Sequence, residues 1–128
     1  MICEATAYAR AGLVGNPSDG YFGKTISFVI RDFAAKVTLY ESPEIEIVPS
    51  FQDRSVYASM RELRDDVRKN GYYGGIRLMK ATIRKFLDYC ESHAIKTPER
   101  NFSIRYRSNI PARVGLSGSS ALVTATLR

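Results

Sequence analysis

The sequence is poor in histidine and cysteine, with one histidine and two cysteines in 128 residues. Cys3 and Cys90 lie far apart and follow no metal-ligand or disulfide-framework spacing, so we expect two reduced thiols of a cytosolic protein. His93 falls near the end of a predicted helix, where an imidazole interacts favourably with the helix C-terminus. We therefore assign it no catalytic role.

Long apolar runs are also missing, and the first residues, Met-Ile-Cys-Glu, contain neither a basic segment nor the apolar core of a signal peptide. The sequence therefore predicts a cytoplasmic protein without membrane contact. A hydrophobic fraction of 45% with 25% charged residues is ordinary for one globular domain. The net charge of +6 favours anionic partners such as nucleotides, acidic sugars or nucleic acid. Most basic side chains alternate with acidic ones on the predicted helices, which is more typical of solvated faces than of a binding stripe.

No lysine occurs after Lys96, which excludes the common Walker phosphate loop from the stretch between Asn109 and Ala121. This stretch is nevertheless rich in glycine and serine and lies between a strand pattern and an apolar helical run. Glycines let a backbone approach a phosphate closely, and the N–H groups at a helix start favour an anion. Taken alone, the stretch is better explained as a flexible turn with Ser119 or Ser120 as an ordinary N-cap.

The hydrophobic pattern predicts a run of strands, two helices, a further strand, and then the glycine-serine stretch and a last helix. The predicted strands span residues 5–13, 24–30, 35–40, 44–48 and 101–107, and the predicted helices span residues 55–69, 74–93 and 121–128. We expect the apolar face of the second helix to pack against the sheet. This order is not a regular βαβα alternation and predicts an α+β fold, a layered sheet with helices. The last helix carries no C-cap signal, which favours a fragment of a longer polypeptide.

A second glycine-rich segment, Gly15-Asn16-Pro17-Ser18-Asp19-Gly20, follows Arg10 of the first predicted strand. Together with Pro111-x-x-x-Gly115-Leu116-x-Gly118-Ser119-Ser120-Ala121, it resembles the motifs of the GHMP small-molecule kinases, the superfamily of galactokinase, homoserine kinase, mevalonate kinase and phosphomevalonate kinase. In that family the first motif runs from a basic residue through Gly-Glu-His-x-Asp, so Asn16 and Pro17 depart from it. The second motif has one residue more than the usual Gly-Leu-Gly-Ser-Ser. Its longer form is similar to that of the glucuronokinases, the nearest resemblance, and of the heptose-phosphate kinases.

The resemblance implies a role for each motif in transfer of the γ-phosphate of ATP to a sugar hydroxyl. Arg10 would be catalytic beside the acceptor hydroxyl, and Asp19 and Asn16 would bind the substrate. The second motif would bind the ATP phosphates through Gly115, Leu116, Ser117, Gly118, Ser119, Ser120 and Ala121. Ser120 would also give an oxygen ligand to Mg²⁺, the ligand type that this cation takes. The expected acceptor is an anionic sugar, with glucuronate giving glucuronate 1-phosphate.

The resemblance covers the whole sequence and implies that residues 1–128 are the N-terminal ATP-binding domain of such a kinase, without its C-terminal domain. We expect this fragment alone to be inactive, because the family's catalytic aspartate and third motif would follow Arg128. Three alternatives stay open: a heptose-phosphate or mevalonate-type acceptor, a catalytically inactive sensor, and an RNA-binding module of the same fold. Only Arg105-Tyr106-Arg107 interleaves basic and aromatic residues as RNA-binding sheets do, so nucleic acid is not the expected partner. The sequence leaves the oligomeric state open.

Overall fold

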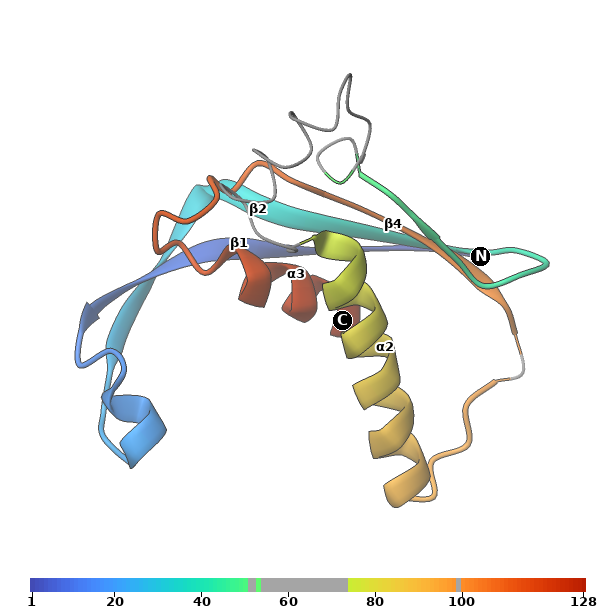
Figure 1. The fold of residues 1–128 in the computed structure, drawn as a ribbon, viewed down its shortest axis with the longest axis horizontal. Helices are drawn as coiled ribbons and strands as arrows, with labels where there is room; N and C mark the ends of the chain where they lie inside the picture. Colours follow the sequence, from blue (N-terminus) through green and yellow to red (C-terminus); the bar gives the residue numbers. More distant parts are fainter. Residues whose placement is uncertain (51–52, 54–73, 99) are drawn as a thin grey trace, which may run out of the picture.

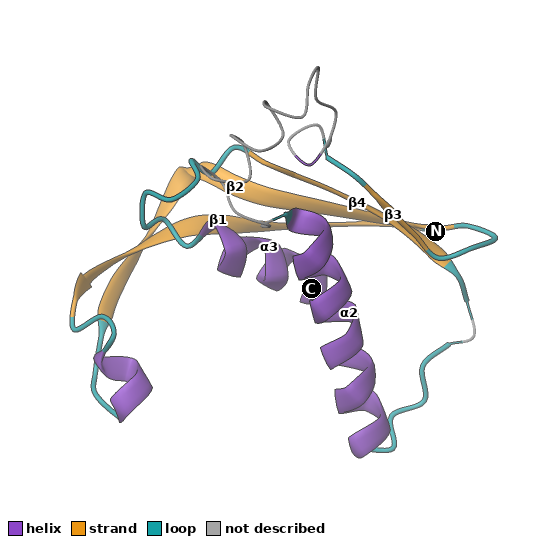
Figure 2. Cartoon of the chain, in the orientation of Figure 1, coloured by secondary structure: helices purple, strands orange, loops and turns teal. Residues whose placement is uncertain are grey.

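The computed structural model describes residues 1–50, 53, 74–98 and 100–128. Its elements, in chain order, are β1 (Ile2–Val14), η1 (Ser18–Tyr21), β2 (Ile26–Glu41), β3 (Glu46–Val48), α2 (Gly75–Ser92), β4 (Phe102–Ser108) and α3 (Gly118–Leu127) (Figure 1). The four strands form one sheet in the order β1-β2-β4-β3. Neighbouring strands are antiparallel except β3 and β4, which are parallel. The predicted α+β fold, a sheet layered with helices, is confirmed (Figure 2).

The longest feature of the sheet is the β1–β2 hairpin, in which the two strands predicted at residues 24–30 and 35–40 are one strand, β2. The prediction of a break was wrong because the irregularity is a bulge and not a turn. The pairing register shifts after Tyr8, and residues 31–33 of β2 bulge out of the ladder. Bulges bend a strand and increase its twist. The outer half of the hairpin bends away from the rest of the sheet and carries η1 at its tip (Figure 1).

Helix α3 lies on one face of the sheet and contacts β1, β2 and β4 (Figure 1). The contact is built largely from alanines, because small side chains let the helix and the strands approach closely. The buried alanines are Ala7 and Ala9 on β1, Ala35 on β2, and Ala121 and Ala125 on α3. The position of α3 is therefore set by the sheet, which makes its N-terminus a rigid platform.

Helix α2 packs chiefly on α3 and not on the sheet, so the predicted packing of its apolar face was wrong in part. Met79 is 0% exposed and Cys90 is buried, but Phe86 and Leu87 are 47% and 44% exposed. The physical reason is that α3 already covers the sheet, which leaves the C-terminal half of α2 beside an apolar cavity of about 760 Å³. Neither α2 nor any other helix in the described ranges is long and apolar enough to cross a membrane.

Three further predictions concern one helix, the histidine and the cysteines. The helix expected at residues 55–69 lies outside the described residues. His93 is the C-cap residue of α2, where its ring stacks on Tyr89 with 4.1 Å between the ring centroids. Both cysteines of the sequence are free, with Cys3 exposed and Cys90 buried. The expectations for the histidine and the cysteines thus agree with where these side chains lie.

Candidate active site

The stretch between β4 and α3 has an unusual backbone, with three residues in the left-handed region within five positions. The φ angles are +62° at Arg113, +77° at Gly115 and +55° at Ser117. L-amino acids with a side chain adopt the left-handed region at a cost of about 1–2 kcal/mol. Of these three residues, only Gly115 therefore adopts it without strain. The stretch is therefore a folded loop with a defined shape, called the Gly-Ser loop below (residues 109–117).

The Gly-Ser loop ends at the N-terminus of α3, and Ser117 is the N-cap residue. The predicted alternative, an ordinary cap by Ser119 or Ser120, is not what the helix start has: Ser117 is left-handed and makes no side-chain cap hydrogen bond. The N–H of Ala121 donates to the carbonyl oxygen of Ser117 at 2.9 Å, which closes the first turn. N–H groups ahead of that turn have no acceptor inside the helix and point toward its N-terminal end. Such an end, with its positive dipole, favours an anion such as phosphate.

Arg10 lies beside this loop, although more than half of the chain separates the two in sequence. The backbone N–H of Arg10 donates to the carbonyl oxygen of Leu116 at 3.2 Å. Strand β1 is at the edge of the described sheet, so its outward N–H groups are available for such a contact. The side chain of Arg10 is exposed. The structure thus brings the predicted catalytic residue next to the predicted phosphate loop.

Asn16 and Asp19 lie at the tip of the β1–β2 hairpin. Asn16 precedes η1, Asp19 lies within it, and both are exposed. The peptide bond between Asn16 and Pro17 is cis. Ser18 closes the turn, because its hydroxyl donates to the carbonyl oxygens of Gly15 and, at 3.2 Å, of Lys24. The hairpin tip reaches away from α2 and α3, so the described residues do not place Asp19 against the Gly-Ser loop (Figure 1).

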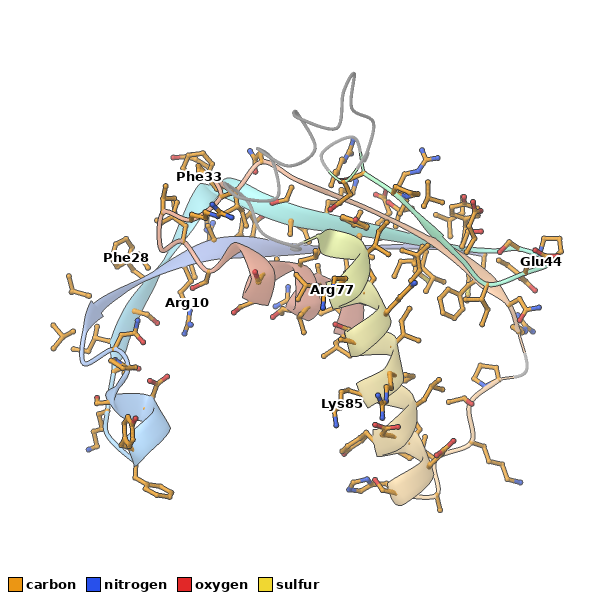
Figure 3. All side chains as sticks on the ribbon, viewed as in Figure 1. Arg10, Phe28, Phe33, Glu44, Arg77 and Lys85 are labelled. Carbon is orange, nitrogen blue, oxygen red and sulfur yellow. The ribbon has the colours of Figure 1, made fainter. Side chains whose placement is uncertain are left out.

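A cavity of about 720 Å³ lies between the Gly-Ser loop, the start of α3 and the start of α2. Its lining includes Ser117, Gly118, Ser119 and Ser120 on one side. Figure 3 shows Arg77, another lining residue, near the upper end of α2. A cavity of this size is in the range of ligand pockets, and its polar wall is made of the residues predicted to bind phosphate.

Sequence reasoning missed the opposite wall of this cavity, which is organised by Asp53. Its carboxylate accepts hydrogen bonds from Ser50 Oγ at 2.6 Å, from the backbone N–H of Gly75 at 2.7 Å, and from Tyr106 Oη. Burial, followed by the hydrogen bond to Asp53, raises the pKa of Tyr106 above its ordinary value. No local pattern signals this cluster, because it joins three segments that are distant in sequence. Gly75 at the start of α2 is the sequence signal that could have indicated a close contact here.

Gly75 is required by this arrangement, because a Cβ at its position would overlap the ring of Tyr106. The ring therefore packs directly against the first turn of α2. Asp53 at the same time accepts from an N–H at the N-terminus of α2, where a carboxylate is favourable. The cluster fixes the start of α2 against β4 and so fixes the shape of the cavity.

Within the described ranges, no group of three histidine, cysteine or acidic side chains is placed to hold a metal ion. The first turn of α3 offers serine oxygens instead, with the side chains of Ser119 and Ser120 exposed. Mg²⁺ takes oxygen ligands, keeps several waters and is commonly held by one or two protein groups plus substrate phosphates. A single hydroxyl beside a helix N-terminus that favours phosphate would fit that requirement.

Comparison with known sequences agrees with this geometry. Residues 77–128 match the family model described as "GHMP kinases N terminal domain". The chain is 45% identical to Glucuronokinase 1 of Arabidopsis thaliana over 125 residues, which cover 97% of this chain and 34% of that protein. It is 43% identical to Probable glucuronokinase 2 of the same plant over 127 residues, which cover 98% and 35%. The chain thus spans about a third of the length of these curated relatives.

Solved structures share the fold. Mevalonate kinase of Methanococcus jannaschii superposes with a TM-score of 0.62 at 24% identity, covering 99% of this chain and 38% of that one. A D-glycero-D-manno-heptose 1-phosphate kinase from Bacteriodes thetaiotaomicron superposes with a TM-score of 0.64 at 24% identity, covering 99% and 40%. The resemblance predicted from the two glycine-rich motifs is therefore confirmed: the chain has the N-terminal fold of the GHMP kinases.

Proposed function

We propose that residues 1–128 are the N-terminal ATP-binding domain of a GHMP-type sugar kinase, which transfers the γ-phosphate of ATP to a sugar hydroxyl. The observation that carries the proposal is the hydrogen bond from the Arg10 N–H to Leu116, because it joins the two motifs at one place. The acceptor that we propose is glucuronate, giving glucuronate 1-phosphate. The 45% identity to a protein named glucuronokinase supports this acceptor.

Phosphoryl transfer depends mostly on positioning and on stabilising charge, and the proposed roles follow from that. The amides and hydroxyls from Gly115 to Ala121 bind the ATP phosphates at the N-terminus of α3. Ser120 holds Mg²⁺, which neutralises phosphate charge when it is bound. Arg10 lies beside the acceptor hydroxyl and stabilises the charge of the transferring group. Asp19 accepts hydrogen bonds from the sugar hydroxyls, and Asn16 donates hydrogen bonds to the sugar and accepts them from it.

The RNA-binding alternative is not supported at Arg105-Tyr106-Arg107, the triplet in which the sequence interleaves basic and aromatic residues. Tyr106 is 4% exposed and its hydroxyl is bonded to Asp53, so its ring is not available to stack on a base. The flanking Arg105 and Arg107 are exposed, but the aromatic ring between them is buried, so this triplet presents no exposed ring. A heptose-phosphate acceptor has the longer form of the second motif and the shared fold in its favour, but the structural match is at 24% identity.

The test uses the full-length polypeptide with Mg-ATP and a panel of glucuronate, neutral sugars, heptose phosphates and mevalonate, with ADP release as the readout. Ser120→Ala and Arg10→Ala are compared with two matched controls on α2, Ser92→Ala and Arg84→Ala, whose side chains are exposed. Turnover of glucuronate that the first two variants suppress and the controls keep supports the proposal. Turnover of another acceptor replaces glucuronate but keeps the kinase. The absence of both turnover and Mg-ATP binding, the latter measured by calorimetry, would overturn the proposal.

A further inference from the structure

The side chain of Asn16 folds back from the hairpin tip onto β1, over Gly12. A Cβ placed on Gly12 would lie 3.1 Å from Cβ of Asn16 and 3.6 Å from its Nδ2. The first distance is tighter than nine in ten real Cβ contacts, so a side chain at residue 12 would push Asn16 away by a few tenths of an ångström. The position of Asn16 therefore depends on the lack of a side chain at residue 12.

Gly12 lies two residues from Arg10, and the pairing of β1 is regular between them, with Arg10 opposite Val29 and Gly12 opposite Ser27. Residues two apart in a strand point to the same face. The amide of Asn16 therefore lies on the face of β1 from which the Arg10 side chain extends. Figure 3 shows Arg10 extending toward the side of the hairpin on which η1 lies.

The turn that leads from β1 to Asn16 has a defined shape. Gly15 has a φ of +82°, and a Cβ there would overlap the carbonyl oxygen of Lys24. The N–H of Ser18 donates to the carbonyl oxygen of Gly15 at 2.6 Å, and the N–H of Gly23 donates to the carbonyl oxygen of Ser18 at 2.7 Å. These bonds close the turn on itself. The turn therefore fixes the backbone of Asn16, and its side chain lies in the space over Gly12.

We propose that Gly12 is a positioning residue that determines acceptor specificity, by letting the Asn16 amide lie beside Arg10 where the two bind the acceptor. The proposal rests on the proposed function and adds to it. An asparagine amide offers two N–H donors and one carbonyl acceptor, and a guanidinium offers a planar set of donors. Side by side, they match an acceptor that carries a carboxylate together with hydroxyls, which is the chemistry of a sugar acid. Gly12 itself touches no substrate.

The test compares Gly12→Ala with Gly20→Ala in the full-length polypeptide. Gly20 is a matched control in the same turn region, because a Cβ there meets nothing within 4 Å. We expect Gly12→Ala to raise KM for glucuronate by about 5-fold or more, the loss of one hydrogen bond, while KM for ATP changes by less than about 2-fold. Gly20→Ala is expected to leave both constants unchanged. Calorimetric Kd values for glucuronate are measured in parallel.

Asn16→Ala and the double variant Gly12→Ala/Asn16→Ala show whether Gly12 acts through Asn16. If it does, the double variant has the KM of Asn16→Ala alone, because effects that act on one contact do not add. Additive effects, an equal rise in KM for ATP, or a Gly12→Ala variant that behaves like Gly20→Ala would each overturn the positioning role.

The outcomes also separate this inference from the proposed function. A wild type that binds glucuronate without phosphorylating it removes glucuronate as the phosphate acceptor, while the role of Gly12 is then decided by the Kd values. A wild type that turns over glucuronate with unchanged constants in Gly12→Ala removes the role of Gly12 alone. A wild type that neither binds nor phosphorylates glucuronate overturns both the role of Gly12 and glucuronate as the acceptor, while turnover of another acceptor keeps the kinase.

Discussion

The backbone N–H of Arg10 donates a hydrogen bond to the carbonyl oxygen of Leu116, with 3.2 Å between nitrogen and oxygen. The main chain of Arg10 thus supports the Gly-Ser loop, while its side chain is exposed and takes no part in that bond. Structural support and the proposed chemistry are therefore carried by different atoms of one residue. This separation lets substitutions test the two roles independently.

Arg10→Ala is expected to lower kcat by on the order of 10²-fold or more, because it removes a charge that stabilises the transferring phosphoryl group. The free energy of unfolding is expected to stay within about 0.5 kcal/mol of wild type, since the backbone N–H remains. Urea unfolding followed by circular dichroism measures the second quantity. Arg10→Lys keeps the charge without the planar fork of the guanidinium, so its kcat should lie between those of wild type and Arg10→Ala. A loss of stability as large as the loss of activity would make the side chain structural.

Gly115→Ala and Ser117→Gly test the backbone of the Gly-Ser loop with opposite expected signs. A Cβ on Gly115 meets nothing within 4 Å, so the cost of Gly115→Ala comes from its φ of +77° alone and should be about 1–2 kcal/mol. Ser117→Gly removes the same kind of strain at +55° and should stabilise the fold by up to about 1 kcal/mol. Denaturant midpoints at equal m-values measure both. Destabilisation by Ser117→Gly would contradict the assignment of strain to Ser117.

Tyr106→Phe removes one of the three hydrogen bonds to the Asp53 carboxylate and leaves the ring in place. We expect a loss of about 1–3 kcal/mol in the free energy of unfolding, because a partly buried carboxylate loses a donor. We also expect a higher KM for ATP, since the start of α2 forms one wall of the cavity. Tyr8→Phe is a suitable control, because Tyr8 is exposed and lies on the hairpin. Equal stability in both variants would show that the bond to Asp53 contributes little.

The same residue predicts a pH dependence above neutrality. The pKa of Tyr106 is raised in the folded state, so the folded protein holds this proton more tightly than the unfolded chain does. Its contribution to stability is complete below the ordinary tyrosine pKa of about 10 and is lost as the pH rises through the folded value. The free energy of unfolding should therefore fall above about pH 10, and Tyr106→Phe should fall less steeply. Parallel curves for the two proteins would contradict this.

Met79→Ala and Phe86→Ala compare two apolar side chains of α2 in different surroundings. Met79 is 0% exposed, and the hydroxyl of Thr126 on α3 donates to its sulfur at 3.3 Å. Its truncation should cost about 2–5 kcal/mol through the cavity that it leaves. Phe86 is half exposed beside the apolar cavity, so its truncation should cost clearly less. Thermal unfolding of both variants measures the difference, and equal losses would show that the second half of α2 is packed more tightly than its exposure indicates.

Much of the fold follows from local pattern. Alternation indicated the strands around Ala7 and Ile104, and the spacing of three and four residues indicated α2, because each period reflects how side chains leave the backbone. The bulge at residues 31–33 was mistaken for a break between two strands, since polar residues interrupt the alternation in the same way in both. The packing of α2 on α3 was missed, because an apolar face does not specify its partner.

The sequence by itself determined the two glycine-rich motifs, the positions of β1, α2 and β4, and the resemblance to the GHMP kinases, because these depend on residue identity and local spacing. Only the tertiary structure decided that Arg10 supports the Gly-Ser loop, that Asp53 bonds Tyr106, and that Gly12 makes room for Asn16. Each of these contacts joins atoms through space, across a sheet edge or a turn. Such distances are set when α3 and the hairpin pack, and no pattern along the chain encodes them.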